Sequence, residues 1–312
     1  MPLIFSARYR IDIGLHVFPT EKYQRIAQRL QRETIEPEPA TWEQLALVHT
    51  PEYLDKMRHG TMSIEEVAQL ELPWSEAMVD GFRLMVGGTI LAARLVCQNR
   101  TPRPPSTRSP IFSAHSARSA FDSAVHIGGG LHHAFPNHGE GFCPFNDVAV
   151  AVRVLQADGI ERHAIVDLDV HHGNGTAFIF ESDPRVFTFS MHQQHNYPMW
   201  KPNGSLDVGL PDGAHDRTYL EALERALPQV LAHRPECVFY LAGADPYEDD
   251  QLGGLRLTKD GLRRRDRLVV DAVRAAGVPL VVTLAGGYAR HVDDTIDIHC
   301  ATVEEVLKAG QV

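Results

Sequence analysis

A buried strand that runs directly into a cluster of polar residues constrains this chain more than any other stretch. Residues 165–170 read Ile-Val-Asp-Leu-Asp-Val, and two histidines and a glycine follow at once. The apolar residues predict a buried strand, and the glycine marks its end. Asp169 and His171 are two positions apart, so their side chains point the same way on an extended backbone. The pair offers two ligands for a divalent metal of the zinc type, whereas a plain polar turn would only present solvated side chains.

Two later strands end in the same manner. One apolar run stops at Asp245, and another passes through two glycines to Tyr288. Because the carboxyl ends of parallel strands meet at one edge of a sheet, Asp245 can join Asp169 and His171 as a third metal ligand. The phenol of Tyr288 would donate to an oxyanion that develops opposite the metal. Taken alone, a strand-ending Asp is more often a helix cap and Gly-Gly-Tyr a turn, and only their joint occurrence favours a site.

A glycine-rich loop contributes two adjacent histidines. Residues 124–133 read Ala-Val-His-Ile-Gly-Gly-Gly-Leu-His-His, and no Gly-Lys-Ser/Thr follows, which excludes a phosphate-binding loop. Imidazole titrates near neutral pH, so His132 and His133 can act as general base and general acid. Asp167 and Asn174 can orient the two rings by hydrogen bonding to the far nitrogen. A lone His-His pair is more often structural, but together with the metal ligands it indicates metal-assisted amide hydrolysis.

Alternating strands and helices define the expected architecture. Apolar strands alternate with helical segments, which predicts an α/β fold with a mainly parallel sheet flanked by helices on both faces. The helical patterns cover residues 21–33, 75–98, 216–233 and 258–276. The chain contains no internal repeat and no convincing linker, so we expect a single domain over residues 1–312.

One stretch departs from this composition. Residues 99–123 are basic, rich in Pro, Ser and Arg, and poor in large apolar side chains. This composition predicts a flexible, exposed insert of about these bounds. A basic interaction arm is the alternative interpretation.

Charge and cysteine content narrow the function classes. The net charge of −10 gives no basis for direct nucleic-acid binding, although an acidic protein can attract cationic substrates. No apolar signal region and no run of about 18 apolar residues occurs, so we expect no membrane insertion and a cytoplasmic location. Four widely spaced cysteines form no Cys-x-x-Cys pair and predict reduced, buried thiols, not a zinc knuckle. They are Cys97, Cys143, Cys237 and Cys300.

Taken in order, these motifs resemble the zinc-dependent histone deacetylase family, which has an arginase-like α/β fold. The matching stretches are residues 128–134, 141–147, 167–175, 242–245 and 286–288, so the resemblance spans nearly the whole chain. It implies zinc binding by Asp169, His171 and Asp245, proton transfer by His132 and His133 with Asp167 and Asn174 as partners, and carbonyl polarisation by Tyr288.

The resemblance also implies secondary sites. A structural potassium ion would involve Asp167, Asp169, His171 and Ser190. The acyl channel would be lined by Gly141, Phe142 and Tyr197, with Leu252 at its rim. Residues 249–255 and the compact length are similar to the class IV branch and its bacterial relatives, and Asn174 stands where class I enzymes have Asp. The class I carboxylate that grips the substrate backbone has no recognisable counterpart around residues 60–72.

From these features we expect a zinc-dependent amidohydrolase that removes acetyl or longer acyl groups from lysine side chains of proteins or peptides. An acetylpolyamine deacetylase, acting on small acylated amines, is the alternative, and Leu252 argues against it because polyamine-selective relatives place a carboxylate at the rim. A binding protein that only recognises acylated partners would have no need of His132, His133 and Tyr288. Arginase-like chemistry with two manganese ions would require further carboxylates.

Overall fold

The structure, a computed structural model, describes residues 1–98 and 122–309. In this part of the chain seven strands form one sheet, with all neighbours parallel, in the order β1-β2-β7-β6-β3-β4-β5. The strands are β1 (Leu3–Ile4), β2 (Ser123–His126), β3 (His163–Asp167), β4 (Val186–Gln193), β5 (Leu206–Leu210), β6 (Cys237–Leu241) and β7 (Leu280–Thr283). The predicted parallel sheet is confirmed. The apolar-run pattern missed β5, because this edge strand alternates between half-buried and exposed residues.

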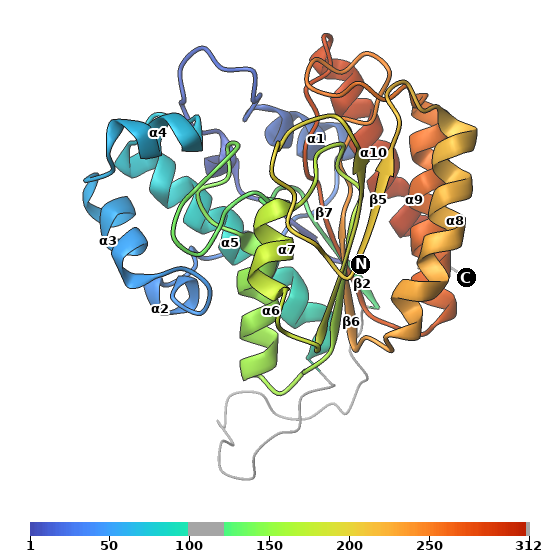
Figure 1. The fold of residues 1–312 in the computed structure, drawn as a ribbon, viewed down its shortest axis with the longest axis horizontal. Helices are drawn as coiled ribbons and strands as arrows, with labels where there is room; N and C mark the ends of the chain where they lie inside the picture. The colour runs from blue at the N-terminus through green and yellow to red at the C-terminus, as the bar shows by residue number, and fades with distance from the viewer. Residues whose placement is uncertain (99–121, 310–312) are drawn as a thin grey trace.

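Helices cover both faces of this sheet, as predicted. Helices α5, α6 and α7 lie on one side, α8, α9 and α10 lie on the other, and α2–α4 form an outer layer beyond α5 (Figure 1). The helices are α1 (Lys22–Leu30), α2 (Trp42–Leu45), α3 (Pro51–His59), α4 (Ile64–Leu70), α5 (Glu76–Cys97), α6 (Asp147–Ala157), α7 (Asn174–Phe180), α8 (Asp216–Ala232), α9 (Lys259–Ala275) and α10 (Val292–Ala309), with a 3₁₀ turn at Ala7–Tyr9. None of the helices in the described ranges has the length and apolar character needed to cross a bilayer.

The predicted insert lies outside the described residues except at its end. Ser123, the last residue assigned to it, already belongs to β2 and pairs with Leu280 of β7. The approximate end of the predicted insert thus overlaps the first residue of β2, because a polar residue opens this strand and continues the polar composition of the preceding segment.

The register of the central strands brings their carboxyl ends level. Asp167 at the end of β3 pairs with Leu241 of β6, and Leu241 pairs with Thr283 of β7. Thr283 in turn pairs with His126, the last residue of β2. On the other side, Asp167 pairs with Ser190 of β4. The loops that leave these adjacent strands therefore start from one edge of the sheet, which is where ligands bind in open parallel sheets.

Candidate active site

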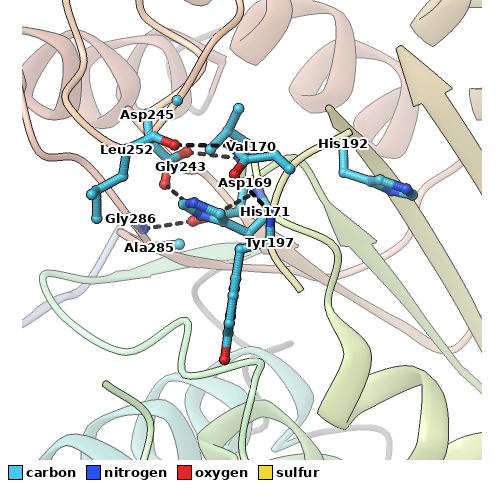
Figure 2. Close-up of polar contacts among 12 residues, drawn as sticks. Asp169, Val170, His171, His192, Tyr197, Gly243, Asp245, Leu252, Ala285 and Gly286 are labelled. Atoms are coloured by element: carbon cyan, nitrogen blue, oxygen red, sulfur yellow. Dashed lines mark hydrogen bonds and ion pairs between the residues drawn. The ribbon is translucent and has the colours of Figure 1, made fainter. Parts of the chain in front are cut away.

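Three of the predicted residues form a compact, buried set of ligand atoms. Asp169 and His171 follow β3, Asp245 follows β6, and one ligand atom from each lies within 4.8 Å of the other two. Nδ1 of His171 is 3.0 Å from Asp169 Oδ1 and 3.6 Å from Asp245 Oδ2 (Figure 2). The three residues are 2%, 7% and 0% exposed in chain order. The structure thus brings together the residues predicted as metal ligands.

Backbone amides hold the two carboxylates of this set. The amide of Gly286 donates to Asp169 Oδ2 at 2.8 Å, and the amide of Val170 donates to Asp245 Oδ1 at 2.8 Å. A Cβ at Gly286 would collide with both carboxylates, so only glycine fits at this position. Asp245 Oδ2 is buried and has no hydrogen-bond partner. A buried, unpaired carboxylate oxygen is costly, and a cation would satisfy it, so the residues fit a bound metal.

The electrostatics of the set also favour a cation. Burial raises the pKa of Asp245 to about 7, and the negative charge of Asp169 adds to this effect. Burial alone would lower the pKa of His171, but the hydrogen bond to Asp169 and the nearby negative charges of Asp169 and Asp245 raise it to about 10. Two carboxylates this close to each other repel, and protons on the set reduce the repulsion. A divalent ion would replace those protons, because metal ligands bind in their deprotonated forms.

The adjacent histidines His132 and His133 have different partners. Their rings lie 4.0 Å apart, centroid to centroid. Nδ1 of His132 is 2.6 Å from Asp167 Oδ2, whereas Nδ1 of His133 is 2.6 Å from Asn174 Oδ1. Burial lowers the pKa of His132, but the carboxylates of Asp167 and Asp169 together outweigh this effect and raise the pKa to about 9. Burial and the charge of His132 hold the pKa of His133 well below its ordinary value.

The first residue of α6 holds the glycine-rich loop that precedes this histidine pair. Asp147, the first residue of α6, accepts hydrogen bonds from the amides of Gly130 at 3.1 Å and Leu131 at 2.7 Å. Gly129 and Gly130 have φ values of +75° and +76°, a conformation that residues with a Cβ rarely adopt. A Cβ at Gly130 would also lie 2.5 Å from Cβ of Ala285. The glycines therefore let the loop turn tightly and deliver both histidines to the site.

Tyr288 is held by its backbone in the loop after β7. Its amide donates to Asp250 Oδ2 at 2.7 Å, and its carbonyl accepts from the amide of Gln251 at 3.1 Å. The ring packs against the rings of Phe18 and Phe142. Burial raises the pKa of the Tyr288 phenol well above its ordinary value, so the hydroxyl keeps its proton and can donate a hydrogen bond.

A cavity of about 200 Å³ reaches these residues from the surface. Its lining consists of Glu71, His133, Gly141, Phe142, His171, Asn196, Tyr197, Leu252 and Tyr288. All four residues predicted to line an acyl channel therefore border one cavity. Figure 2 shows Tyr197 standing beside His171, and their ring centroids are 6.2 Å apart. A smaller space of about 30 Å³, bordered by Asp169, His132 and Tyr288 among others, continues the cavity inward.

The sequence interpretation missed the carboxylate at the mouth of this cavity. Glu71 caps the carboxyl end of α4 with a left-handed backbone, at φ 60° and ψ 22°. Burial raises the pKa of its carboxyl group. No motif marks Glu71 in the sequence, since its place depends on a helix end that only the folded chain defines. Glu140, which hydrogen-bonds to Asn174, was missed as well.

The residues assigned to a potassium site lie on two neighbouring strands and in the loop after one of them: Asp167 ends β3, and Ser190 lies inside β4. Asp167 and Ser190 are paired across β3 and β4, and Asp169 and His171 follow Asp167 directly. Ser190 Oγ is 3.1 Å from Nδ1 of His192, a residue that lies apart from the Asp-His-Asp set in Figure 2. The four residues thus share one region of the sheet edge.

Comparisons with known proteins agree with this arrangement. The family model described as histone deacetylase domain matches residues 16–303. An uncharacterized protein of Picosynechococcus sp. is 40% identical over 96% of this chain and 95% of its own length. Histone deacetylase 2 of Arabidopsis thaliana is 30% identical over 95% of this chain and 77% of its own length.

Solved structures share the fold. The HD domain of HDA15 superposes with a TM-score of 0.76 over 100% of this chain and 93% of its own, at 24% identity. The predicted arginase-like α/β architecture is therefore confirmed. Since the family model covers nearly all of the chain that carries the Asp-His-Asp set, the histidine pair and Tyr288, the chain belongs to the histone deacetylase family and is a hydrolase of amide bonds.

Proposed function

We propose that the chain is a zinc-dependent deacylase that removes acetyl or longer acyl groups from lysine side chains of proteins or peptides. The observation that carries the proposal is the cavity of about 200 Å³ that leads from the surface to the buried Asp-His-Asp set. A narrow passage lined by Phe142 and Tyr197 suits the aliphatic chain of an acylated lysine, because its wall is aromatic and its inner end is polar.

Zinc is the proposed catalytic cofactor, held by Asp169, His171 and Asp245. Two carboxylates and one imidazole are ligands that zinc accepts, and three protein ligands leave room for substrate and water. When bound, zinc supplies Lewis acidity, which polarises the acyl carbonyl and lowers the pKa of water. Asp167, Asp169, His171 and Ser190 are the proposed region of a structural potassium ion.

The paired histidines are the proposed proton-transfer groups. His132 contacts the carboxylate of Asp167, which stabilises an imidazolium, so His132 is suited to hold a proton and release it to the leaving amine. Nδ1 of His133 hydrogen-bonds to the neutral amide of Asn174, which offers no such charge, so His133 is suited to accept a proton from water. The Tyr288 hydroxyl would donate to the carbonyl oxygen of the acyl group as negative charge develops there.

The amide partner of His133 also supports placement near the class IV branch. Asn174 replaces the aspartate that class I members would have, and the stretch at 249–255 is similar to that branch. We propose this placement on the residues, and we expect it to be reflected in the acyl-chain preference.

Acetylpolyamine hydrolysis is the second candidate, and Glu71 favours it. Glu71 is exposed and borders the cavity, so its negative charge would attract any cationic substrate. The rim residue Leu252 argued against polyamines from the sequence, but Glu71 places a carboxylate at the same mouth. The same charge also suits a lysine-rich peptide, so the two candidates share this feature.

Turnover of an acyl-chain series on one lysine peptide, from acetyl to myristoyl, by zinc-loaded protein tests the main proposal. We expect hydrolysis that a chelator abolishes and that added zinc restores. A side-by-side assay with acetylspermidine tests the second candidate, and Glu71→Gln should raise KM most for the more cationic substrate. Absence of turnover on every acyl-lysine peptide, together with turnover of acetylspermidine, would replace the first candidate by the second.

A further inference from the structure

Glu140 binds two residues of the site on one side and two supporting residues on the other. Its Oε1 accepts hydrogen bonds from Asn174 Nδ2 at 2.7 Å and from the Tyr197 hydroxyl at 2.9 Å. Its Oε2 accepts from Gln69 Nε2 at 3.2 Å and lies 3.4 Å from His138 Nε2. The side chain is 14% exposed, so these contacts are largely shielded from solvent.

The backbone of the channel loop fixes the position of Glu140. Gly141 and Phe142 both have positive φ values, 52° and 67°, as in a tight two-residue turn. Two backbone hydrogen bonds close the turn. The Cys143 amide donates to the Glu140 carbonyl at 2.9 Å, and the Glu140 amide donates to the Cys143 carbonyl at 3.2 Å. The same two turn residues border the cavity, so the turn joins Glu140 directly to the cavity wall.

The contacts of Glu140 determine the orientation of the neighbouring amide. An ionised carboxylate only accepts hydrogen bonds, so Asn174 must present its NH₂ group to Glu140. Its oxygen then faces His133, 2.6 Å from Nδ1. An amide oxygen also only accepts, so Nδ1 of His133 must carry the proton and Nε2 must keep its lone pair.

We propose that Glu140 is a positioning residue that, through the amide of Asn174, holds His133 in the Nδ1–H tautomer and leaves Nε2 free to accept a proton. The inference rests on the proposed function for its catalytic meaning, but not for the tautomer itself. The side-chain amide of Asn174 lies between His133 and the carboxylate of Glu140, whereas His132 hydrogen-bonds directly to the carboxylate of Asp167. His133 is thereby oriented without an adjacent negative charge that would stabilise its protonated form.

The charge state that this role needs is supported by the surroundings of Glu140. Burial alone would raise the pKa of its carboxyl group, but hydrogen bonds from His138, Asn174, Tyr197 and Gln69 hold the pKa below its ordinary value. Glu140 therefore stays an acceptor at neutral pH.

An exchange of acceptor and donor tests this inference. Asn174→Asp alone places two carboxylates in contact and should lower kcat by about 10-fold or more, in the range found for partners of active-site ligands. Glu140→Gln alone should keep most activity, because a glutamine oxygen still accepts from Asn174. Combined, Asn174→Asp with Glu140→Gln should recover part of the kcat that Asn174→Asp loses, since the glutamine NH₂ donates to the new carboxylate, whereas the negative charge beside His133 keeps kcat below that of the wild type. Losses that simply multiply in the double variant would overturn the proposal.

A stronger variant and a matched control complete the kinetic test. Glu140→Leu removes the acceptor and should lower kcat about 10-fold or more with KM changed much less. Gln229→Ala removes an exposed side chain on α8 that does not contact Glu140 and should leave kcat within about 2-fold. Tyr197→Phe should change KM more than kcat. If Tyr197→Phe lowered kcat as much as Glu140→Leu does, the loss of kcat would come from the cavity wall, and the proposal would be wrong.

The tautomer has a readout that needs no turnover. In ¹⁵N-histidine NMR spectra of zinc-loaded protein, the His133 signals, assigned by their absence in His133→Asn, should show protonated Nδ1 and unprotonated Nε2. Glu140→Leu should add the other tautomer. A wild-type protein with the expected tautomer but without acyl-lysine turnover would contradict the proposed function and support this inference, whereas a protonated Nε2 would contradict the inference alone.

Discussion

Asp167 Oδ2 lies 2.6 Å from Nδ1 of His132, and both side chains are almost completely buried. Asp167→Asn keeps the shape of this contact but removes the charge that stabilises a protonated His132. We expect kcat on an acyl-lysine peptide to fall by about 10- to 100-fold, as for other partners of active-site histidines. KM should change little, because Asp167 does not border the cavity.

The control for this variant is retention of the metal. Asp167 Oδ1 accepts from the Asp169 amide at 3.2 Å, so a displaced ligand loop would also reduce activity. Zinc content measured by mass spectrometry should stay near that of the wild type. A variant that loses zinc along with activity would show that Asp167 supports the ligand loop and not the proton transfer.

The orphaned oxygen of Asp245 predicts a strong coupling between metal and stability. Zinc should raise the melting temperature of the metal-free protein, with a gain in unfolding free energy of about 4 kcal/mol at a free zinc concentration 1,000-fold above Kd. Asp245→Asn should abolish most of this gain, because the amide cannot replace a carboxylate ligand. The carboxylate of Asp297 lies on α10 in surface ion pairs, so Asp297→Asn should show the wild-type response. Equal zinc responses in Asp245→Asn and the wild type would exclude Asp245 as a ligand.

Tyr288→Phe isolates the contribution of one hydroxyl group. The ring contacts with Phe18 and Phe142 do not need the hydroxyl, so the fold and zinc content should be retained. Loss of one donor to a developing oxyanion lowers kcat by about 10²- to 10³-fold. Steady-state kinetics with Tyr247→Phe, a tyrosine outside the cavity lining, provide the comparison. Activity near that of the wild type in Tyr288→Phe would remove the oxyanion role.

Part of this site could be predicted from sequence because its chemistry coincides with strand ends. Asp169, His171 and Asp245 each follow an apolar run, and the parallel sheet brings such positions to one edge. Tyr288 follows the same rule after β7. Periodicity and turn residues carry this information, so the α/β fold class and the grouping of Asp169, His171 and Asp245 followed from them.

Glu71 and Glu140 could not be predicted in the same way. Glu71 reaches the cavity mouth because α4 ends in a left-handed residue, and Glu140 reaches Asn174 because a turn with two positive φ values follows it. Gly139 and Gly141 indicate a tight loop here, but Phe142 does not favour a positive φ, so the sequence does not predict the geometry that directs Glu140 to Asn174. Contacts of this kind depend on the meeting of distant loops, which local sequence patterns do not encode.

Acid should destabilise the protein through His49, which is 2% exposed and connects the backbone at Phe135 with the backbone at Asn146. Its Nδ1 lies 3.0 Å from the Phe135 carbonyl, and its Nε2 accepts from the Asn146 amide at 3.1 Å, so the ring is neutral. Burial lowers its pKa to about 4. Above the unfolded pKa, about 6.5, both states are neutral at His49 and its contribution is complete. Between about pH 6.5 and pH 4, His49 binds a proton in the unfolded chain but not in the folded protein. The free energy of unfolding therefore falls by up to about 1.4 kcal/mol for each pH unit.

Urea unfolding at pH 7, 6 and 5 measures this dependence. His49→Gln keeps a donor and an acceptor but has no titrating group. Its unfolding free energy should therefore fall less steeply between pH 6.5 and 4, and the slope should be smaller by up to the amount that binding of one proton contributes. The other buried histidines are the same in His49→Gln and in the wild type, so the difference between their slopes of unfolding free energy against pH is due to His49. His59→Gln changes an exposed histidine on α3 and should keep the wild-type slope. If His49→Gln and the wild type lost stability in parallel, His49 would have to be protonated in the folded state, and its acceptor bond with Asn146 could not then exist.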